Sequence, residues 1–297
     1  MADLLVRDNP RRDELRAALA QRRAVAAPGA YDALTARLVE DAGFEVVYMT
    51  GFGTTASLLG RPDVGLLGQA EMVDNARRIV QAVDRPVIAD ADTGYGNPIN
   101  VIRTVREYEQ AGVAAIHLED QVSPKKCGHL AGKVVVPAED MEAKVRAAVA
   151  ARTDPDFVII ARTDARAVEG IDAAIERARR YADAGADVLF VEAPTSDEEV
   201  EQVATELADH TLVFNWAEGG RTPPVGVERL RELGYALVLF PIGALLAATA
   251  GVREHLEHLK AHGTPEGRLD RLPSFEEITS LVGIDEVRAL EERFRQV

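Results

Sequence analysis

Residues 100–121 read NVIRTVREYEQAGVAAIHLEDQ, and this stretch contains one complete helix–turn–strand unit. Apolar residues recur at helical spacing over Asn100–Gln110, and Gly112 follows at the position of a left-handed helix C-cap. Ala114–Leu118 is a short apolar run without polar alternation, as expected for a parallel strand buried on both faces. Polar residues come directly after it at 119–121, so the unit ends in side chains that can bind a ligand or transfer a proton.

The same unit recurs along the whole chain. Eight short apolar runs are found at Ala24–Ala27, Val46–Met49, Pro86–Ala89, Ala114–Leu118, Phe157–Ala161, Val188–Val191, Leu212–Phe214 and Ala236–Phe240. The segments between them have helical periodicity, as at Ala70–Ala82 and Ile171–Ala184, and glycines 43, 185 and 234 precede further strands. Eight strands that alternate with helices predict an α/β protein with a closed (β/α)₈ TIM-type barrel, with an open α/β sheet as the alternative.

Both ends of the chain extend beyond this barrel. Arg11–Arg22 predicts an extra N-terminal helix, and Gly243–Ala261 predicts a helix after the eighth strand. A Gly/Pro/Arg-rich segment follows at 263–273, and Phe275–Val297 predicts one or two more helices. We expect one domain over residues 1–297, with a C-terminal tail that either covers the barrel or reaches a neighbouring subunit.

The composition excludes several classes of protein. The chain has 34 Lys and Arg against 49 Asp and Glu, a net charge of −15, which argues against nucleic-acid binding. Cys127 is the single cysteine, so no intrachain disulfide can form. No apolar segment follows a basic start, and no stretch approaches the roughly 18 apolar residues of a membrane span. We therefore expect a soluble, cytoplasmic protein without a membrane or nucleic-acid partner.

Acidic side chains follow neighbouring strands. Asp90 and Asp92 come after the third apolar run and Glu119 after the fourth, and strand ends form the active-site rim of such barrels. Carboxylates that converge in a cleft repel one another unless a cation neutralises them. The pattern predicts a hard divalent cation, with Mg²⁺ as the best fit. The alternative is that the aspartates only cap the next helix.

Three further features point to the same rim. Arg162 directly follows the fifth run and either binds a carboxylate or forms a structural salt bridge to Glu192 or Asp164. Cys127 lies in a long polar loop, after two lysines, a setting that favours a thiolate able to exchange a proton. The loop is also a candidate lid, and the spacing excludes a zinc site. Residues 50–53, Thr-Gly-Phe-Gly, either bind an anion through backbone N–H groups or form a plain glycine turn.

Together these motifs resemble the isocitrate lyase and phosphoenolpyruvate mutase superfamily. The likeness extends from Pro28 to about Phe294, and its most specific part is the Lys-Cys-Gly-His loop at 126–129. The other matching stretches are Gly60–Gly65 (GRPDVG), Asp90–Gly96 (DADTGYG), His117–Gln121 (HLEDQ) and Ile160–Ala165 (IARTDA).

The resemblance implies an assembly and a metal. It implies a barrel whose C-terminal helices, about 243–297, are swapped with a neighbouring subunit, in a homotetramer built as a dimer of dimers. It implies Mg²⁺, with Mn²⁺ as an alternative ion, held at Asp90 and Asp92 and supported through water by Asp63 and Glu119.

The resemblance also implies roles for the other rim residues. Cys127 is expected to be the general acid/base, with Arg162 and Glu192 as further catalytic residues. Contacts with a small 2-oxo or 2-hydroxy carboxylate are expected from Tyr48, Thr50, Gly51, Phe52, Gly53, Gly128, His129 and Asn215. The implied reaction passes through an enolate-like intermediate.

Departures from the family pattern narrow the predicted substrate. The stretch Phe240–Leu246 carries no charge, and Leu272–Phe275 lacks the arginine that methylisocitrate lyases use, so a third carboxylate would meet an apolar wall. Trp216 and Pro223–Pro224 suggest a partly apolar pocket. We therefore predict a carbon–carbon lyase that cleaves a dimethylmalate-, methylmalate- or methylisocitrate-like acid to a 2-oxo acid.

Other functions on this scaffold are kept as alternatives. Carboxyphosphonoenolpyruvate mutases share the cysteine loop, and oxaloacetate hydrolases share the scaffold. Phosphoenolpyruvate mutases and phosphonopyruvate hydrolases generally lack the loop cysteine. An inactive barrel that serves as a binding protein is the alternative outside enzyme chemistry.

Overall fold

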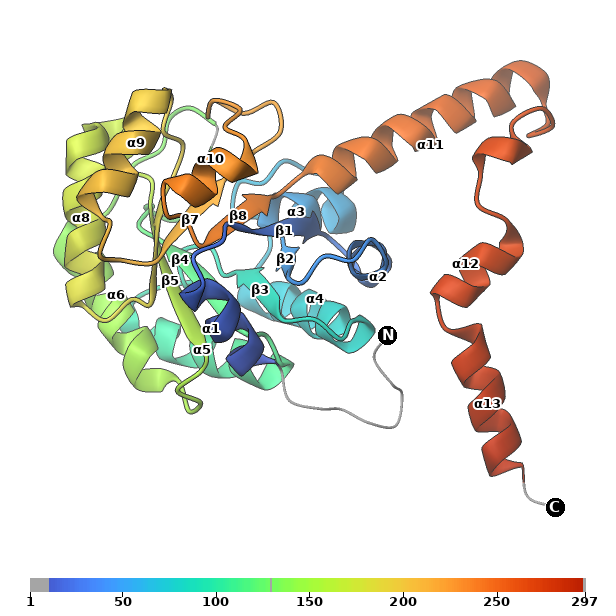
Figure 1. Cartoon of the computed structure of the whole chain (residues 1–297), viewed down its shortest axis with the longest axis horizontal. Helices are drawn as coiled ribbons and strands as arrows, with labels where there is room; N and C mark the ends of the chain where they lie inside the picture. The colour runs from blue at the N-terminus through green and yellow to red at the C-terminus, as the bar shows by residue number, and fades with distance from the viewer. Residues whose placement is uncertain (1–10, 129, 296–297) are drawn as a thin grey trace.

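The computed structural model describes residues 11–128 and 130–295. Eight parallel strands form a closed barrel in which each strand pairs with the next and β8 pairs with β1 (Figure 1). The strands are β1 (Val25–Ala30), β2 (Val47–Met49), β3 (Val87–Asp90), β4 (Ala115–Glu119), β5 (Val158–Thr163), β6 (Val188–Val191), β7 (Leu212–Asn215) and β8 (Leu237–Phe240). Each predicted apolar run is a strand, so the barrel prediction is confirmed over the open sheet.

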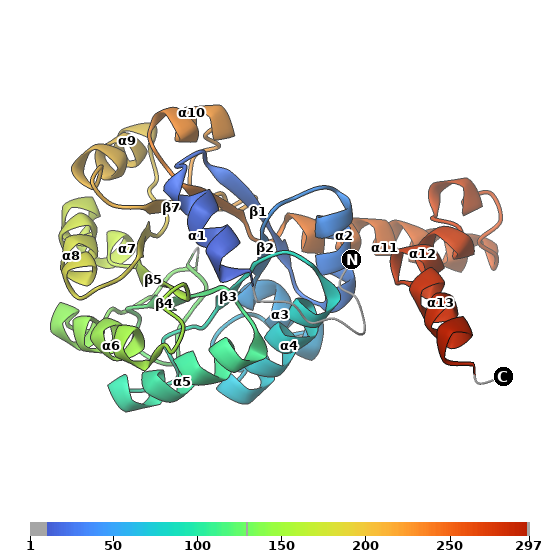
Figure 2. The same ribbon diagram turned by 60° about the horizontal axis from the view of Figure 1, so that its bottom comes forward.

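Helices surround this barrel (Figure 2). They are α2 (Ala33–Asp41), α3 (Gly51–Leu59), α4 (Gln69–Ala82), α5 (Pro98–Ala111), α6 (Ala138–Ala151), α7 (Arg166–Glu169), α8 (Ile171–Asp183), α9 (Asp197–Glu206) and α10 (Val227–Glu232). The unit quoted at the outset shows why they form. Asn97 caps α5 through its side chain, Pro98 occupies the first turn, and Gly112 ends the helix at φ 90°.

The extra N-terminal helix α1 (Arg12–Ala20) closes one end of the barrel. Its Leu15 and Leu19 are buried in the same apolar cluster as inward-facing strand residues such as Ile160. Arg12 donates to the carbonyls of Glu109 and Val113, which precede β4. This end carries the N-terminal ends of the strands, so the opposite end remains for the functional site.

The C-terminal segment leaves the barrel as an arm. It consists of α11 (Gly243–His262), a short 3₁₀ turn (Leu269–Arg271), α12 (Phe275–Leu281) and α13 (Ile284–Phe294), as Figure 1 shows. No residue of α11 is buried. The arm bends back so that Arg37 of α2 donates to the Leu281 carbonyl at 3.2 Å. The predicted C-terminal helices are therefore present.

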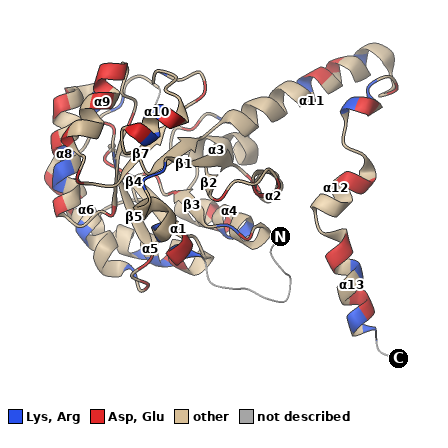
Figure 3. Cartoon of the chain, in the orientation of Figure 1, with Lys and Arg blue, Asp and Glu red and all other residues tan. Residues whose placement is uncertain are grey.

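Charged side chains are spread over the outer helices, whereas the barrel-proximal part of α11 carries none (Figure 3). Within the described ranges, no helix is long and apolar enough to cross a membrane.

Candidate active site

A cavity of about 180 Å³ opens at the carboxyl ends of the strands. Its lining includes most of the predicted site: Tyr48, Thr50, Phe52, Asp63, Asp90, Glu119, Cys127, Gly128, Arg162, Glu192 and Asn215. Residues separated by more than 160 positions therefore meet at one rim, as the barrel topology requires. His129 lies outside the described residues.

One half of the site is acidic. Asp90 and Glu119 are the last residues of β3 and β4, and Asp63 comes from the segment between α3 and α4. The ammonium nitrogen of Lys125 lies 2.6 Å from Asp63 Oδ2 and 2.8 Å from Asp92 Oδ1. All five side chains are buried, so their charges interact strongly.

Burial makes Asp92 and Glu119 difficult to ionise, whereas the charges of His117, Lys125 and Arg162 lower the pKa of Asp90 despite its burial. Burial raises the pKa of Asp92 to about 7 against the attraction of Lys125, and the charges of Asp90 and Asp63 add to the rise. Burial likewise holds the pKa of Glu119 well above its usual value, although Arg162 opposes the effect. Glu119 Oε1 is buried and accepts no hydrogen bond within the described part of the chain. The cluster therefore has more carboxylates than the single ammonium of Lys125 can neutralise.

These residues fit a hard divalent cation. They offer several carboxylate oxygens at one side of the cavity, which are the ligands that Mg²⁺ prefers. Among the described residues, no three His, Cys, Asp or Glu side chains are yet arranged as a complete metal cluster. Lys125 instead supplies the local cation to Asp63 and Asp92. Sequence reasoning missed this lysine because nothing in its spacing shows where its side chain points.

The backbone fixes the acidic half in an uncommon conformation. Asp92 has φ 48°, in the left-handed region that non-glycine residues seldom adopt. Its N–H donates to Asp90 Oδ1 at 2.9 Å, and its carbonyl accepts from the N–H of Glu119 at 2.9 Å. Strain held by such contacts is typical of functional sites, and here it sets the mutual position of three acids.

Two buried polar side chains, Tyr48 and His117, form a line of contacts that ends at Asp90. The hydroxyl of Tyr48 and Nε2 of His117 are 2.9 Å apart, and the same nitrogen lies 3.6 Å from Asp90 Oδ1. Burial lowers the pKa of His117, although the charge of Asp90 opposes the shift. A neutral imidazole therefore links the predicted substrate contact Tyr48 to the acidic half.

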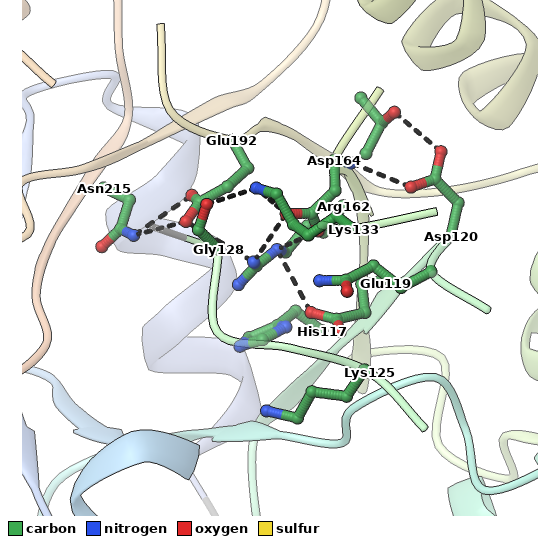
Figure 4. Close-up of polar contacts among 12 residues, drawn as sticks. His117, Glu119, Asp120, Lys125, Gly128, Lys133, Arg162, Asp164, Glu192 and Asn215 are labelled. Carbon is green, nitrogen blue, oxygen red and sulfur yellow. Dashed lines mark hydrogen bonds and ion pairs between the residues drawn. The ribbon is translucent and has the colours of Figure 1, made fainter. Parts of the chain in front are cut away.

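The other half of the site is built around Arg162 at the end of β5. Its Nε and Nη2 donate to the two oxygens of Asp164 at 2.9 and 3.1 Å (Figure 4). Nε also lies 3.3 Å from Glu119 Oε2, and Nη2 lies 3.5 Å from Glu192 Oε1. The predicted structural salt bridges are therefore present. The described hydrogen bonds of Arg162 come from Nε and Nη2, and the residue lines the cavity.

Further contacts hold this half in place. Asn215 Nδ2 donates to both oxygens of Glu192, at 3.3 and 3.1 Å. Burial opposes ionisation of Asp164, yet Arg162 and Lys133 attract its negative charge and lower its pKa. Asp120 receives the N–H of Asp164 at 2.8 Å. Each acid here has a donor within the chain.

The segment Thr50–Gly53 is the beginning of a helix. Thr50 is the N-cap of α3, and its hydroxyl accepts the N–H of Gly53. The alternative of a plain glycine turn is therefore wrong, and a helix N-terminus is able to bind an anion, as the predicted role of these residues needs. A Cβ at position 51 would lie 2.4 Å from Asp90 Oδ2, so only glycine permits this approach of α3 to the acids.

The cysteine loop covers the cavity between β4 and α6. Cys127 is half-buried, and its N–H donates to the Asp63 carbonyl at 3.2 Å. The preceding lysines direct their ammonium groups elsewhere, Lys125 to the acids and Lys126 to the Gly132 carbonyl. These described contacts of the two lysines are with groups other than the thiol.

One predicted part of the pocket wall is wrong. Trp216, Pro223 and Pro224 are not among the described lining residues. The ring of Trp216 lies tilted against that of Phe240, with 5.9 Å between centroids, and its indole N–H donates to the Val225 carbonyl at 3.0 Å. The apolar lining comes instead from Phe52, Leu130, Ala217, Pro241 and Ile242.

The chain is similar to known proteins over nearly its full length. A family model described as phosphoenolpyruvate phosphomutase matches residues 15–260. The chain is 48% identical to a 2,3-dimethylmalate lyase from Eubacterium barkeri, covering 95% of this chain and 97% of that protein. It is also 48% identical to a probable 2-methylisocitrate lyase from Corynebacterium glutamicum, covering 88% and 86%.

Solved structures agree with this relationship. A crystal structure of 2,3-dimethylmalate lyase superposes with a TM-score of 0.91 at 40% identity, covering 97% of this chain and 96% of that one. A phosphonopyruvate hydrolase in complex with oxalate and Mg²⁺ superposes with a TM-score of 0.88 at 33% identity, covering 97% and 100%. The chain therefore belongs to the phosphoenolpyruvate mutase/isocitrate lyase superfamily of enzymes.

Proposed function

We propose that the chain is a Mg²⁺-dependent carbon–carbon lyase that cleaves a small 2-hydroxy dicarboxylate to a 2-oxo acid, such as pyruvate, and a second carboxylate. One observation carries the proposal: a single cavity brings together Asp63, Asp90 and Glu119, the guanidinium of Arg162 and the thiol of Cys127. Lyases that share 48% identity over nearly the whole chain support the reaction class.

The proposed metal ligands are Asp90 and Asp92, with Asp63 and Glu119 in support. A bound Mg²⁺ neutralises carboxylates and stabilises negative charge on substrate oxygens. The related hydrolase in complex with oxalate and Mg²⁺ supports this choice of ion.

The chain's own residues then orient the substrate and deliver a proton. Arg162 binds a substrate carboxylate while Asp164 and Glu192 fix the guanidinium. The backbone N–H groups at the start of α3 bind a second oxygen cluster. A carboxylate of the acidic half accepts the proton of the 2-hydroxyl, and the O–H electron pair forms the C=O bond of the 2-oxo acid. The C–C bond breaks, and its electron pair moves to the carbon beside the second carboxylate. Cys127 donates a proton to that carbon.

The cavity wall supports a small and partly apolar substrate. Pro241 and Ile242, after β8, line the cavity beside Leu130, and neither position offers a cation. A third carboxylate placed there would lose its hydration without a partner, at a cost of several kcal/mol (roughly 2–7 for an uncompensated polar group). The proposed preference is therefore for a dimethylmalate- or methylmalate-type acid over a tricarboxylate.

The arm supports an assembly proposal. Residues 243–297 are proposed to exchange between paired subunits, in a dimer of dimers. Apolar side chains of α11 and α13, including Val252, Leu256 and Phe294, are exposed on the single chain. Exposed apolar surface of this kind marks a protein interface. Light scattering should give a tetramer, and deletion of 263–297 should reduce the mass; a wild-type monomer would contradict the proposal.

The reaction is tested with Mg²⁺ and a panel of 2,3-dimethylmalate, 2-methylmalate, 2-methylisocitrate, isocitrate and oxaloacetate. Release of the 2-oxo acid is followed, with EDTA as control. The expected result is Mg²⁺-dependent cleavage with the highest kcat/KM on a dicarboxylate. Preference for a tricarboxylate would contradict the proposal that the apolar cavity wall disfavours a third carboxylate. Turnover of oxaloacetate alone would favour a hydrolase, and silence would favour carboxyphosphonate chemistry, which phosphorus NMR detects.

A further inference from the structure

Lys133 is a buried lysine in the cysteine loop that the reaction proposed above does not use. Its side chain is 2% exposed, although lysine is rarely buried without a partner. It points inward, between Gly128 and Asp164, as Figure 4 shows. Lys126 in the same loop has an exposed ammonium contact with the Gly132 carbonyl, so the two lysines differ in environment.

The contacts of Lys133 connect the loop to the arginine half of the site. Its ammonium donates to the Gly128 carbonyl and, at 2.9 Å, to Asp164 Oδ1. Asp164 also receives both donors of Arg162. Lys133 and Arg162 therefore share one carboxylate, and the loop backbone is fastened to that pair.

Gly128 lies directly against the same group of side chains. A Cβ at this position would fall 2.0 Å from Glu192 Oε1 and 2.5 Å from Arg162 Nη2. The peptide that follows Cys127 thus packs on the Arg162–Glu192 pair without room for a side chain. A change in this contact alters the distance between the proton donor and the carboxylate-binding guanidinium.

Other contacts hold different parts of the loop. The Cys127 N–H is bound by the Asp63 carbonyl, and Gln121 exchanges hydrogen bonds with the backbone of Lys126. The base is closed by the bridge between Gln121 and Val135. These contacts hold the loop to the acidic half and close its own base. The ammonium of Lys133, in contrast, connects the loop to Asp164, the carboxylate that also binds Arg162.

We propose that Lys133 is a positioning residue that holds the Cys127–Gly128 segment against the Arg162–Asp164–Glu192 group, and so sets the proton donor relative to the bound substrate carboxylate. The proposed consequence for turnover rests on the function proposed above. The position of the loop itself does not, because it follows from contacts within the chain.

The test uses the full-length protein with Lys133→Met, Lys133→Arg and Lys126→Met as the matched control. The first readout is the rate at which iodoacetamide alkylates Cys127, the single cysteine, without substrate. Lys133→Met should react about 10- to 100-fold faster, as expected for the loss of one charge-assisted hydrogen bond that keeps the loop closed. Lys133→Arg should stay within about 10-fold of wild type on the same scale, and Lys126→Met should match wild type.

The second readout is kinetic, on whichever acid of the panel is cleaved. Lys133→Met should lower kcat more than it raises KM, because donor alignment matters mainly in the transition state. A silent panel with faster alkylation would overturn the lyase proposal and retain the positioning role.

If Lys133→Met does not fold, Gly128→Ala disturbs the same contact and leaves Lys133 in place, and it should also increase alkylation. Wild-type alkylation rates in every folded variant of Lys133 and Gly128 would overturn the proposal.

Discussion

The two halves of the cavity differ in how their charges are balanced. Around Arg162, the chain supplies its own counter-charges, and the pKa of Asp164 is lowered by Arg162 and Lys133 despite burial. Around Asp90, the chain supplies one lysine to several carboxylates, and burial raises the pKa of Asp92 to about 7. The first half is charge-balanced as folded, whereas the proposed Mg²⁺ would add positive charge to the second. The difference separates residues that hold the site together from the residues proposed to bind the ion.

The largest effect that tests this contrast is expected from removing Arg162, the central cation of its half of the cavity. Arg162→Met should destabilise the metal-free protein by about 3–5 kcal/mol, because Asp164, Glu119 and Glu192 would be left as buried acids without it. Urea unfolding in EDTA measures the loss. Asp92→Asn, which removes a repelling charge from the acidic half, should cost far less. Equal losses would contradict the contrast.

Cys127 tests the boundary between the halves, because its N–H contacts Asp63 while Gly128 contacts Arg162 and Glu192. Cys127→Ser should lower kcat by roughly 100- to 10,000-fold, the range typical for a general acid. Steady-state kinetics measures this on the cleaved acid. Mg²⁺ affinity and the unfolding midpoint should be unchanged; a parallel loss of either would make the cysteine structural.

Mg²⁺ should stabilise the acidic half specifically. At a concentration 100 times its Kd, the ion should add about 2.7 kcal/mol to the free energy of unfolding, since it binds only the folded chain. Thermal unfolding with MgCl₂ measures the gain, and NaCl of equal ionic strength is the control. Asp90→Asn should abolish the gain. A gain that survives this substitution would place the metal elsewhere.

The pH dependence of the metal-free protein tests the charge balance of the acidic half directly. The pKa of Asp92 rises from 3.8 to about 7 on folding, so between these values the folded chain keeps a proton that the unfolded chain releases. Stability should therefore fall as pH rises through this window and level off above it. The lowered pKa of Asp164 makes its contribution to stability fall as pH drops below about 3.8, so it adds no slope in this window. Unfolding midpoints in EDTA should show the slope in wild type and a weaker one in Asp92→Asn.

The fold was predictable because the spacing of apolar residues along the chain is periodic. Each apolar run such as Ala114–Leu118 is a strand, and Gly112, which precedes that run, caps a helix, since these features depend on local spacing. Asp90, Glu119 and Arg162 were found by the same reasoning, because residues at strand ends must meet at the rim of a barrel.

The remaining features depend on side-chain direction, which spacing does not encode in loops. Lys125 and Lys133 lie in an aperiodic segment, and the structure alone shows that they point at Asp63 and Asp164. Trp216 follows β7 near the rim, yet it turns to Phe240 and leaves the wall to Pro241 and Ile242. The start of α3 was missed because glycines 51 and 53 suggest a turn more strongly than a helix.

The position of helix α1 determines from which end of the barrel substrate and products can reach the cavity. Leu15 and Leu19 close the end of the barrel that carries the N-terminal ends of the strands. The route to the site therefore runs through the opposite end, where the loop with Cys127 lies. A lyase makes two molecules from one, and both must leave by the entrance that the substrate used. We therefore expect the loop to open and reclose in every catalytic cycle, so that its opening rate would set an upper limit on turnover.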